Sequence, residues 1–325
     1  MNSPLPYNRQ NALASAIAAD NASSIAGKIV LTTGVTQGGL GATFVSAIAQ
    51  YKPRLLILAG RSAEKVQATT QAIKSHASSS EVEVRFLSLD LSSQASVRSA
   101  AEKVLSWADV PHIDVLVNSA GIMAGPYRTT AEGIENQFGS NHIGHFLFTN
   151  LLMPKLLVAP SPRVVSVASD GHRFSGVRFD DVNFQDGKAY EQWAAYGQSK
   201  TANILFARAL AEKLGGRGLR AYSLHPGVAF GTSLAPHGLT EEDIAGIGAK
   251  DKEVGWDREL DVKSLDECAA THVAAAFDLR LDAYNGVYLE DGNLSDDLQP
   301  TATNSADVEK LWKLSEKLVG QEFTY

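Results

Sequence analysis

The stretch of residues 28–49, KIVLTTGVTQGGLGATFVSAIA, decides the fold class of this chain. It predicts a β-strand that ends at Thr33, a loop with four glycines, and a helix that follows at once. Such glycines let the backbone turn tightly and approach a pyrophosphate, whose charge then lies at the helix N-terminus. The pattern therefore predicts a dinucleotide site, although glycines that serve packing alone would look similar. The candidate contacts are Gly34, Gly39, Leu40 and Gly41.

The rest of the chain alternates between short apolar runs and longer helical patterns. Apolar runs predict strands at 28–33, 55–59, 82–89, 113–118, 163–169, 220–225 and 286–289. Helical patterns between them cover 40–51, 62–75, 93–109, 132–154 and 190–214. Continuously apolar strands that alternate with helices indicate a parallel sheet covered on both faces. We therefore expect an α/β fold, a Rossmann-type doubly wound parallel sheet of about seven strands in a single domain.

Two segments stand apart from this alternation. Residues 1–25 precede the first strand and are expected to form an N-terminal arm outside the core, with a short helix near 12–19. The Rossmann domain is expected to cover 26–325. Residues 229–266 are charged, contain glycines and follow a late strand. Because ligands bind beyond the carboxyl ends of parallel strands, we expect this segment to be the substrate loop.

Composition and charge exclude several classes of protein. The only cysteine, Cys268, rules out an internal disulfide framework and fits a reducing compartment. A net charge of −7 without a dense basic stretch argues against nucleic-acid binding. The longest apolar stretch, 143–158, is too short and too often interrupted to span a bilayer, and the N-terminus lacks a signal-peptide pattern. We expect a cytoplasmic protein without a membrane span and without a bound metal.

The end of the second predicted strand indicates which dinucleotide is bound. Folds that prefer NAD place an acidic residue about 20 positions beyond the glycines. That count from Gly41 reaches Arg61, and no acidic residue lies between Leu55 and Ala63. An arginine suits the 2′-phosphate of NADP through charge-assisted hydrogen bonds. We therefore expect NADP(H), the alternative being a surface arginine at the start of a helix.

Tyr196 and Lys200 occupy positions i and i+4 of a predicted helix and share one of its faces. A nearby ammonium stabilises a phenolate and lowers the tyrosine pKa. Tyr196 would then be a general acid or base for a carbonyl–alcohol pair. On spacing alone, an ordinary pair on the helix surface explains the pattern better. His142 and His145 have no further ligand at a suitable spacing, which favours packing over metal binding.

The chain resembles the short-chain dehydrogenase/reductase family from about Lys28 to Leu294, through seven motifs in the family's order. They are Thr33-Gly34…Gly39-x-Gly41, Leu89-Asp90-Leu91, Asn118-Ser119-Ala120-Gly121, Asn141-His142-x-Gly144-His145, Val167-Ala168-Ser169, Tyr196-x-x-x-Lys200 and His225-Pro226-Gly227. The helices around Asn141 and Tyr196 resemble the retinol dehydrogenase-like branch, and so does the long interval between Ser169 and Tyr196.

The resemblance implies a role for each catalytic residue. Tyr196 would exchange a proton with the substrate oxygen, which Ser169 would orient by a hydrogen bond. Lys200 would lower the tyrosine pKa and bind the nicotinamide ribose. Asn141 would hold a water in a proton relay, while the nicotinamide carries the hydride. The remaining expected cofactor contacts are Asp90, Leu91, Asn118, Ala120, Gly121, Pro226, Gly227, Val228 and Thr232.

The sequence also departs from the family pattern. The glycine motif is one residue longer than usual, which leaves open which glycine faces the pyrophosphate. The expected activity is NADP-dependent interconversion of an alcohol and a ketone or aldehyde, with reduction of an apolar or aromatic carbonyl compound as the physiological direction. The alternative is a non-catalytic NADP-sensing or scaffold protein. The resemblance also implies a homodimer or homotetramer that pairs through the helices of Asn141 and Tyr196.

Overall fold

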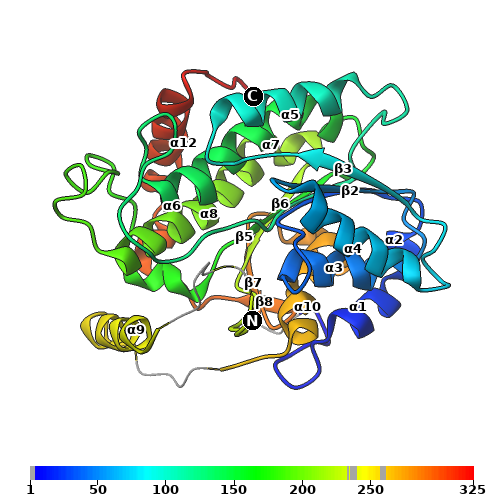
Figure 1. The fold of residues 1–325 in the computed structure, drawn as a ribbon, viewed down its shortest axis with the longest axis horizontal. Helices are drawn as coiled ribbons and strands as arrows, with labels where there is room; N and C mark the ends of the chain where they lie inside the picture. Colours follow the sequence, from blue (N-terminus) through cyan, green and yellow to red (C-terminus); the bar gives the residue numbers. More distant parts are fainter. Residues whose placement is uncertain (1–3, 233, 235–239, 257–260) are drawn as a thin grey trace.

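The computed structural model of the protein describes residues 4–232, 234, 240–256 and 261–325 (Figure 1). Within these residues one sheet has the strand order β3-β2-β1-β4-β5-β6-β7-β8. The strands are β1 (Ile29–Thr33), β2 (Leu55–Gly60), β3 (Glu83–Ser88), β4 (Val115–Asn118), β5 (Arg163–Val167), β6 (Arg220–Leu224), β7 (Tyr288–Glu290) and β8 (Asn293–Ser295). Strands β1 to β7 pair in parallel, which confirms the predicted doubly wound sheet. The sequence did not indicate β8, a three-residue antiparallel partner of β7.

Helices cover both faces of the sheet, as the alternating pattern predicts (Figure 1). One layer holds α1 (Ala14–Asp20), α2 (Ala22–Ile25), α3 (Leu40–Ala49), α4 (Ala63–Ser75) and α10 (Leu265–Phe277). The other holds α5 (Gln94–Ser106), α7 (Gly144–Leu156), α8 (Gln192–Leu214) and α12 (Ser305–Val319). Side chains alternate along a strand, so β1 contributes to the core on both faces of the sheet. Ile29 and Leu31 join one core, and Val30 joins the other.

The N-terminal segment is part of the core, so the expectation of an arm outside it is wrong. Ala14, Ile17 and Ala18 lie on one face of α1 and are fully buried, as is Ile25 of α2. This face of α1 packs against the alanine-rich helix α10 and against α3. The reason is that α10 covers the sheet with small side chains, and α1 supplies the next apolar surface over it.

The predicted helix over 132–154 is interrupted where it passes the sheet edge. It comprises α6 (Asn136–Phe138), a π-helical turn (Gly139–Ile143) and α7. π-Helical turns are rare and occur frequently at functional sites. At the start of α7, a Cβ on Gly144 would lie only 2.4 Å from the carbonyl oxygen of Leu91. Glycine therefore lets α7 approach the loop that follows β3.

The carboxyl ends of the parallel strands meet at one edge of the sheet. The chain leaves β1 and β4 in opposite directions, so a crevice opens between the loops that follow them. Of the remaining elements, η2 (Asp170–Phe174) follows β5 and α9 (Glu241–Glu253) follows β6, whereas η3 (Gly215–Arg217) and η4 (Leu279–Ala283) precede β6 and β7 at the opposite edge. Helix α11 (Pro300–Thr303) packs against α8. Helix α9 stands apart from both layers (Figure 1). None of the helices in the described part of the chain combines the length and hydropathy that a membrane crossing requires.

Candidate active site

A cavity of about 1350 Å³ runs along the carboxyl edge of the sheet. It brings together most of the residues that the sequence predicted for cofactor binding and catalysis. Its lining includes Gly34, Gly39, Leu40, Gly41, Arg61, Asp90, Leu91, Ala120, Gly121, Ser169, Tyr196, Lys200, Pro226, Gly227, Val228 and Thr232. Two predicted residues, Asn118 and Asn141, are buried beside the cavity and do not line it.

The glycine loop forms a cradle at the N-terminus of α3. No side chain caps this helix at Gly39, so the backbone N–H groups of its first turn face the cavity end without a capping oxygen. A Cβ on Gly34 would lie 2.6 Å from the Ala120 Cα, and one on Gly41 would lie 2.7 Å from the Gly34 carbonyl oxygen. These two glycines therefore permit close packing of loop, helix and β4. The cradle fits a pyrophosphate.

The additional residue of the glycine motif is accommodated at Gly38. Gly38 is exposed, has a φ of +81° and would meet nothing within 4 Å of an added Cβ. Gly39 is then the N-cap of α3 and donates its N–H to the Thr36 carbonyl oxygen at 2.9 Å. Gly39 and Gly41 line the cavity, and Gly38 does not.

Arg61 and Asp90 lie at the opposite end of the cavity from the catalytic tyrosine motif. Arg61 is exposed just after β2, and the following residue, Ser62, caps α4 by accepting the Lys65 N–H at 3.3 Å. Asp90 accepts hydrogen bonds from the backbone and side chain of Ser92 through its Oδ1. Asp90 thus organises the turn into α5 and also faces the cavity.

Ser169, Tyr196 and Lys200 meet where β5 and α8 approach each other. The Tyr196 ring lies against Gly171, where a Cβ would come within 2.7 Å of Tyr196 Cε1. Lys200 donates to the Val167 carbonyl oxygen at 3.1 Å, and its Nζ is 5.5 Å from the centroid of the Tyr196 ring. Ser169 Oγ accepts the Gly171 N–H at 3.0 Å. This arrangement excludes the alternative of a surface pair, because Tyr196 and Lys200 are both buried.

Burial controls the ionisation of this cluster. It lowers the pKa of Lys200 from 10.5 to about 8, because an ammonium is poorly solvated there. It raises the pKa of Tyr196 above the ordinary value of 10.0, and the hydrogen bond with Ser169 offsets only part of this effect. Burial thus favours the neutral phenol of Tyr196, and the lowering of its pKa that the resemblance implied is not found in this structure.

Asn141 fixes the loop behind the nicotinamide end of the cavity. Its Oδ1 accepts the Ile122 N–H at 2.8 Å, and its Nδ2 donates to the Ile122 carbonyl oxygen at 2.9 Å and to Ser199 Oγ at 3.0 Å. A Cβ on Gly121 would lie 3.4 Å from Asn141 Oδ1 and 3.6 Å from Lys200 Nζ. The two side chains are thus neighbours, and the water relay through Asn141 stays a prediction.

Asn118 lies beside the cavity without lining it, and its expected cofactor contact stays a prediction. It is the last residue of β4, 2% exposed, and its Nδ2 donates to Thr149 Oγ1 on α7 at 2.9 Å. Its side chain thus joins β4 to α7 beneath the cavity floor. The neighbouring Ala120 and Gly121 line the cavity in its place.

A hydrogen-bond chain through His145 connects the glycine loop to the π-helical turn. Thr33 Oγ1 accepts the N–H groups of Ser119 and Ala120, each at 3.0 Å, so its own proton is directed to His145 Nε2 at 2.9 Å. His145 then carries its proton on Nδ1 and donates it to the Asn141 carbonyl oxygen at 3.0 Å. Burial lowers the pKa of His145 to about 4, which keeps it neutral. The i, i+4 spacing from Asn141 was the signal for this role.

The substrate end of the cavity combines an apolar wall with charged side chains. Phe174, Trp193, Ile244, Ile247 and Trp256 supply the apolar part. The predicted substrate loop, 229–266, contributes α9 to this wall, while its residues 233, 235–239 and 257–260 lie outside the described chain.

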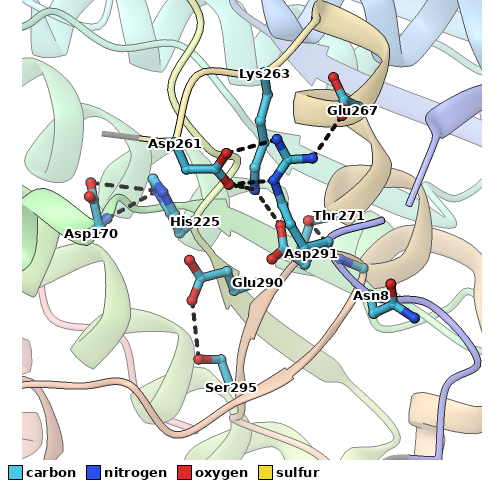
Figure 2. Close-up of polar contacts among 12 residues, drawn as sticks. Asn8, Asp170, His225, Asp261, Lys263, Glu267, Thr271, Glu290, Asp291 and Ser295 are labelled. Carbon is cyan, nitrogen blue, oxygen red and sulfur yellow. Dashed lines mark hydrogen bonds and ion pairs between the residues drawn. The ribbon is translucent and has the colours of Figure 1, made fainter. Parts of the chain in front are cut away.

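Figure 2 shows the polar side of the same region. Asp170 lies beside His225, whose Nδ1 accepts the Asp170 N–H at 3.1 Å. Lys263 lies between Asp261 and Asp291, and Glu290 accepts from Ser295 Oγ at 3.4 Å. Apart from His225, which belongs to the His225-Pro226-Gly227 motif, sequence reasoning missed these residues because they come from separate loops. In the described part of the chain, no group of three or more His, Cys, Asp or Glu side chains is placed to hold a metal ion.

Comparisons with known proteins agree with this geometry. A family model described as short chain dehydrogenase matches residues 28–180. Retinol dehydrogenase 13 of Homo sapiens is 36% identical over 302 residues, which are 92% of this chain and 86% of the relative. The short-chain dehydrogenase/reductase prx1 of Penicillium rubens is 35% identical over 314 residues, 92% of this chain and 87% of the relative.

Solved structures have the same fold. The crystal structure of an uncharacterized protein from Mycobacterium Paratuberculosis aligns with a TM-score of 0.67 and 31% identity, over 95% of this chain and 98% of that one. Levodione reductase aligns with a TM-score of 0.62 over 82% of this chain and 97% of its own, and at 21% identity it supports the fold alone. The relatives and the family model together show that the chain belongs to the short-chain dehydrogenase/reductase family, on its retinol dehydrogenase-like branch, whose members are oxidoreductases that use nicotinamide cofactors.

Proposed function

We propose that this protein is an NADP-dependent oxidoreductase that interconverts an alcohol and a ketone or aldehyde, and that it reduces an apolar or aromatic carbonyl compound. The observation that carries the proposal is the placement of Ser169, Tyr196 and Lys200 on one cavity that continues to the glycine cradle at α3. A protein that only senses the dinucleotide has no need of a buried proton donor at that position. The relatives' name, retinol dehydrogenase, refers to an alcohol and supports the same chemistry.

The bound nicotinamide supplies the hydride, and the side chains handle the substrate oxygen. Tyr196 donates its phenolic proton to that oxygen, and Ser169 orients it through a hydrogen bond. Lys200 stabilises the developing phenolate with its ammonium. Asn141, beside Lys200, holds the water through which the tyrosine regains its proton.

Arg61 supports the preference for NADP over NAD. It lines the adenosine end of the cavity, where a 2′-phosphate would gain a charge-assisted hydrogen bond from a guanidinium. We expect Arg61→Asp to shift the ratio of kcat/KM from NADPH toward NADH by about tenfold or more, since it replaces an attractive charge with a repulsive one. A variant that keeps its NADPH preference would refute the phosphate assignment.

The apolar wall supports the proposed substrate class. A ketone or aldehyde with an aliphatic or aromatic body would bury that body against Phe174, Trp193 and the isoleucines of α9. Its oxygen would then lie at Ser169 and Tyr196.

The experiment that tests the function is a screen of carbonyl compounds that follows NADPH absorbance. We expect turnover that Tyr196→Phe lowers by about two to four orders of magnitude, with NADPH affinity nearly unchanged, because only the proton donor is removed. Tight NADPH binding without consumption across the panel would favour the sensing or scaffold protein instead. Full activity of Tyr196→Phe would refute the mechanism.

We further propose that the enzyme works in the cytoplasm, since its only cysteine, Cys268, is free and buried. A homodimer or homotetramer also remains a proposal. In this structure α12 packs over α8 and the π-helical turn, so it covers part of the surface through which we expected two copies to pair. Light scattering of the purified protein would give the oligomeric state.

A further inference from the structure

Asp170 directly follows Ser169 and accepts a hydrogen bond from its hydroxyl group. Ser169 Oγ donates to Asp170 Oδ1 at 3.0 Å and accepts the Gly171 N–H at 3.0 Å. The Ser169 proton is therefore directed to Asp170, and it must turn from Asp170 to hydrogen-bond a substrate oxygen. Whatever holds Asp170 consequently determines how easily Ser169 can turn its proton to the substrate.

Asp170 is held by a buried arginine. Asp170 Oδ2 lies 2.8 Å from Arg173 Nη1, one turn later in η2. The Arg173 side chain is only 5% exposed, and its Cζ lies 4.3 Å from the centroid of the Phe174 ring and 4.8 Å from that of the Trp256 ring. Burial and these two cation–π contacts restrict the guanidinium.

The same arginine reaches a second carboxylate on α9. Arg173 Nε donates to Asp251 Oδ1 at 2.7 Å. This contact orients the guanidinium group of Arg173. Arg173 Nη1 consequently lies close to Asp170 but is not aligned for a hydrogen bond with it. One guanidinium is thus shared between the serine loop and α9. Because two carboxylates already neutralise it, Arg173 is not a binding site for an anionic substrate.

Helix α9 has few other attachments to the domain. Among its described residues none is buried. Its further polar contacts are Gln192 Nε2 to Asp243 Oδ1 at 2.8 Å and Lys250 to Glu191 at 4.0 Å. The buried Trp193 Nε1 faces Gly246 and has no hydrogen-bond partner in the described structure. A buried donor without a partner costs free energy, which further weakens the packing of α9 against α8. Elements with so few buried apolar contacts open at low cost in free energy.

We propose that Arg173 is a positioning residue that links the seating of α9 to the orientation of the Ser169 hydroxyl through Asp170. When α9 is seated against a substrate, Asp251 holds the guanidinium so that Nη1 lies 2.8 Å from Asp170 without an aligned hydrogen bond, and this position fixes where the Asp170 carboxylate holds the Ser169 hydroxyl. When Asp251 is lost, Arg173 rotates toward Asp170 and repositions its carboxylate. This inference rests on the proposed function, since Ser169 is taken to orient a substrate oxygen.

A double-mutant cycle tests the link, because Asp170 and Asp251 are joined through Arg173. In NADPH-dependent carbonyl reduction, we expect Asp251→Asn chiefly to raise KM and Asp170→Asn chiefly to lower kcat. The combined effect on kcat/KM should differ from the product of the two single effects by about threefold or more. In an Arg173→Met background, which keeps an apolar stem beside the two rings, the effects of Asp170→Asn and Asp251→Asn on kcat/KM should multiply without coupling.

The matched control is Glu253→Gln, which removes a carboxylate from the same helix. In the described structure Glu253 pairs with Lys250 at 2.9 Å and not with Arg173. This variant should change neither constant and should not couple to Asp170→Asn. If the Asp170 and Asp251 effects simply multiply in the wild-type background, or if Glu253→Gln couples equally, the proposal is overturned.

Hydrogen exchange of residues 241–253 gives a readout that does not require turnover. Asp251→Asn and Arg173→Met should each speed exchange there, whereas Asp170→Asn should not. If the wild type reduces no carbonyl compound, the proposed function fails, and these exchange rates still decide whether Arg173 seats α9. Unchanged exchange in both variants would refute the seating. Should Arg173→Met fail to fold, the Asp170/Asp251 cycle alone decides the coupling.

Discussion

Raising the pH should inactivate the enzyme through Lys200. Its ammonium is buried and donates to the Val167 carbonyl oxygen at 3.1 Å. Burial lowers the pKa of Lys200 to about 8, within the range of an ordinary assay. Tyr196 adds no competing ionisation there, because burial raises its pKa above 10.0. If carbonyl reduction needs the charged ammonium, activity will follow the protonated fraction of Lys200.

The magnitude follows from that pKa. With one ionisation near pH 8, the protonated fraction is about one half at pH 8, about one tenth at pH 9 and about one hundredth at pH 10. The assay is kcat/KM for NADPH at a saturating carbonyl concentration, because this constant reports ionisations of the free enzyme. We expect a plateau below about pH 7 and a tenfold loss for each pH unit above about pH 8.

Unfolding should not imitate this loss. The pKa of Lys200 is lower in the folded than in the unfolded chain, so the unfolded state binds more protons between about pH 8 and 10.4. The stability contributed by this group therefore rises with pH in that window, and circular dichroism should show a folded protein. Lys200→Arg keeps its charge to high pH and should lose the inflection, at a lower plateau. An inflection near pH 8 that persists in this variant would refute the reasoning.

Two further predictions concern packing. Gly34→Ala should destabilise the protein by more than the ~1–2 kcal/mol of a left-handed alanine, because its Cβ would also clash with Ala120. Gly38→Ala, also at positive φ but in open space, should show only the backbone cost, and equal urea midpoints for the two variants would contradict this account. Trp312→Ala should lower the free energy of unfolding by about 3–5 kcal/mol, because the ring is 1% exposed among buried aromatic side chains. A loss below about 1 kcal/mol in urea denaturation would show that α12 contributes little to the core.

The sequence predicted the parts of this protein that depend on local pattern. Continuous apolar runs located the seven parallel strands, because a strand covered on both faces has no polar side. Strand order then brought Ser169 to the cavity that holds Tyr196 and Lys200. The family motifs carried this information, and the spacing of Tyr196 and Lys200 alone favoured an ordinary surface pair.

Features that depend on contacts between distant segments were not predictable. Asp251 meets Arg173 from 78 positions further along the chain, and neither residue belongs to a motif. The burial of α1 likewise depends on α10, whose small side chains leave room for a second layer. The strand β8 has three residues, which is too short for any periodicity to be recognised.

The position of α12 has a consequence for how the protein is made. Trp312 packs 5.1 Å from Phe146 and 6.3 Å from Phe206, measured between ring centroids, and all three side chains are buried. During synthesis the two phenylalanines leave the ribosome more than a hundred residues before the tryptophan that covers them. Until then the nascent domain exposes an aromatic surface, and chaperones that recognise such surfaces have their longest access to it at this stage. Synthesis of α12, rather than assembly of the sheet, therefore completes this layer of the core.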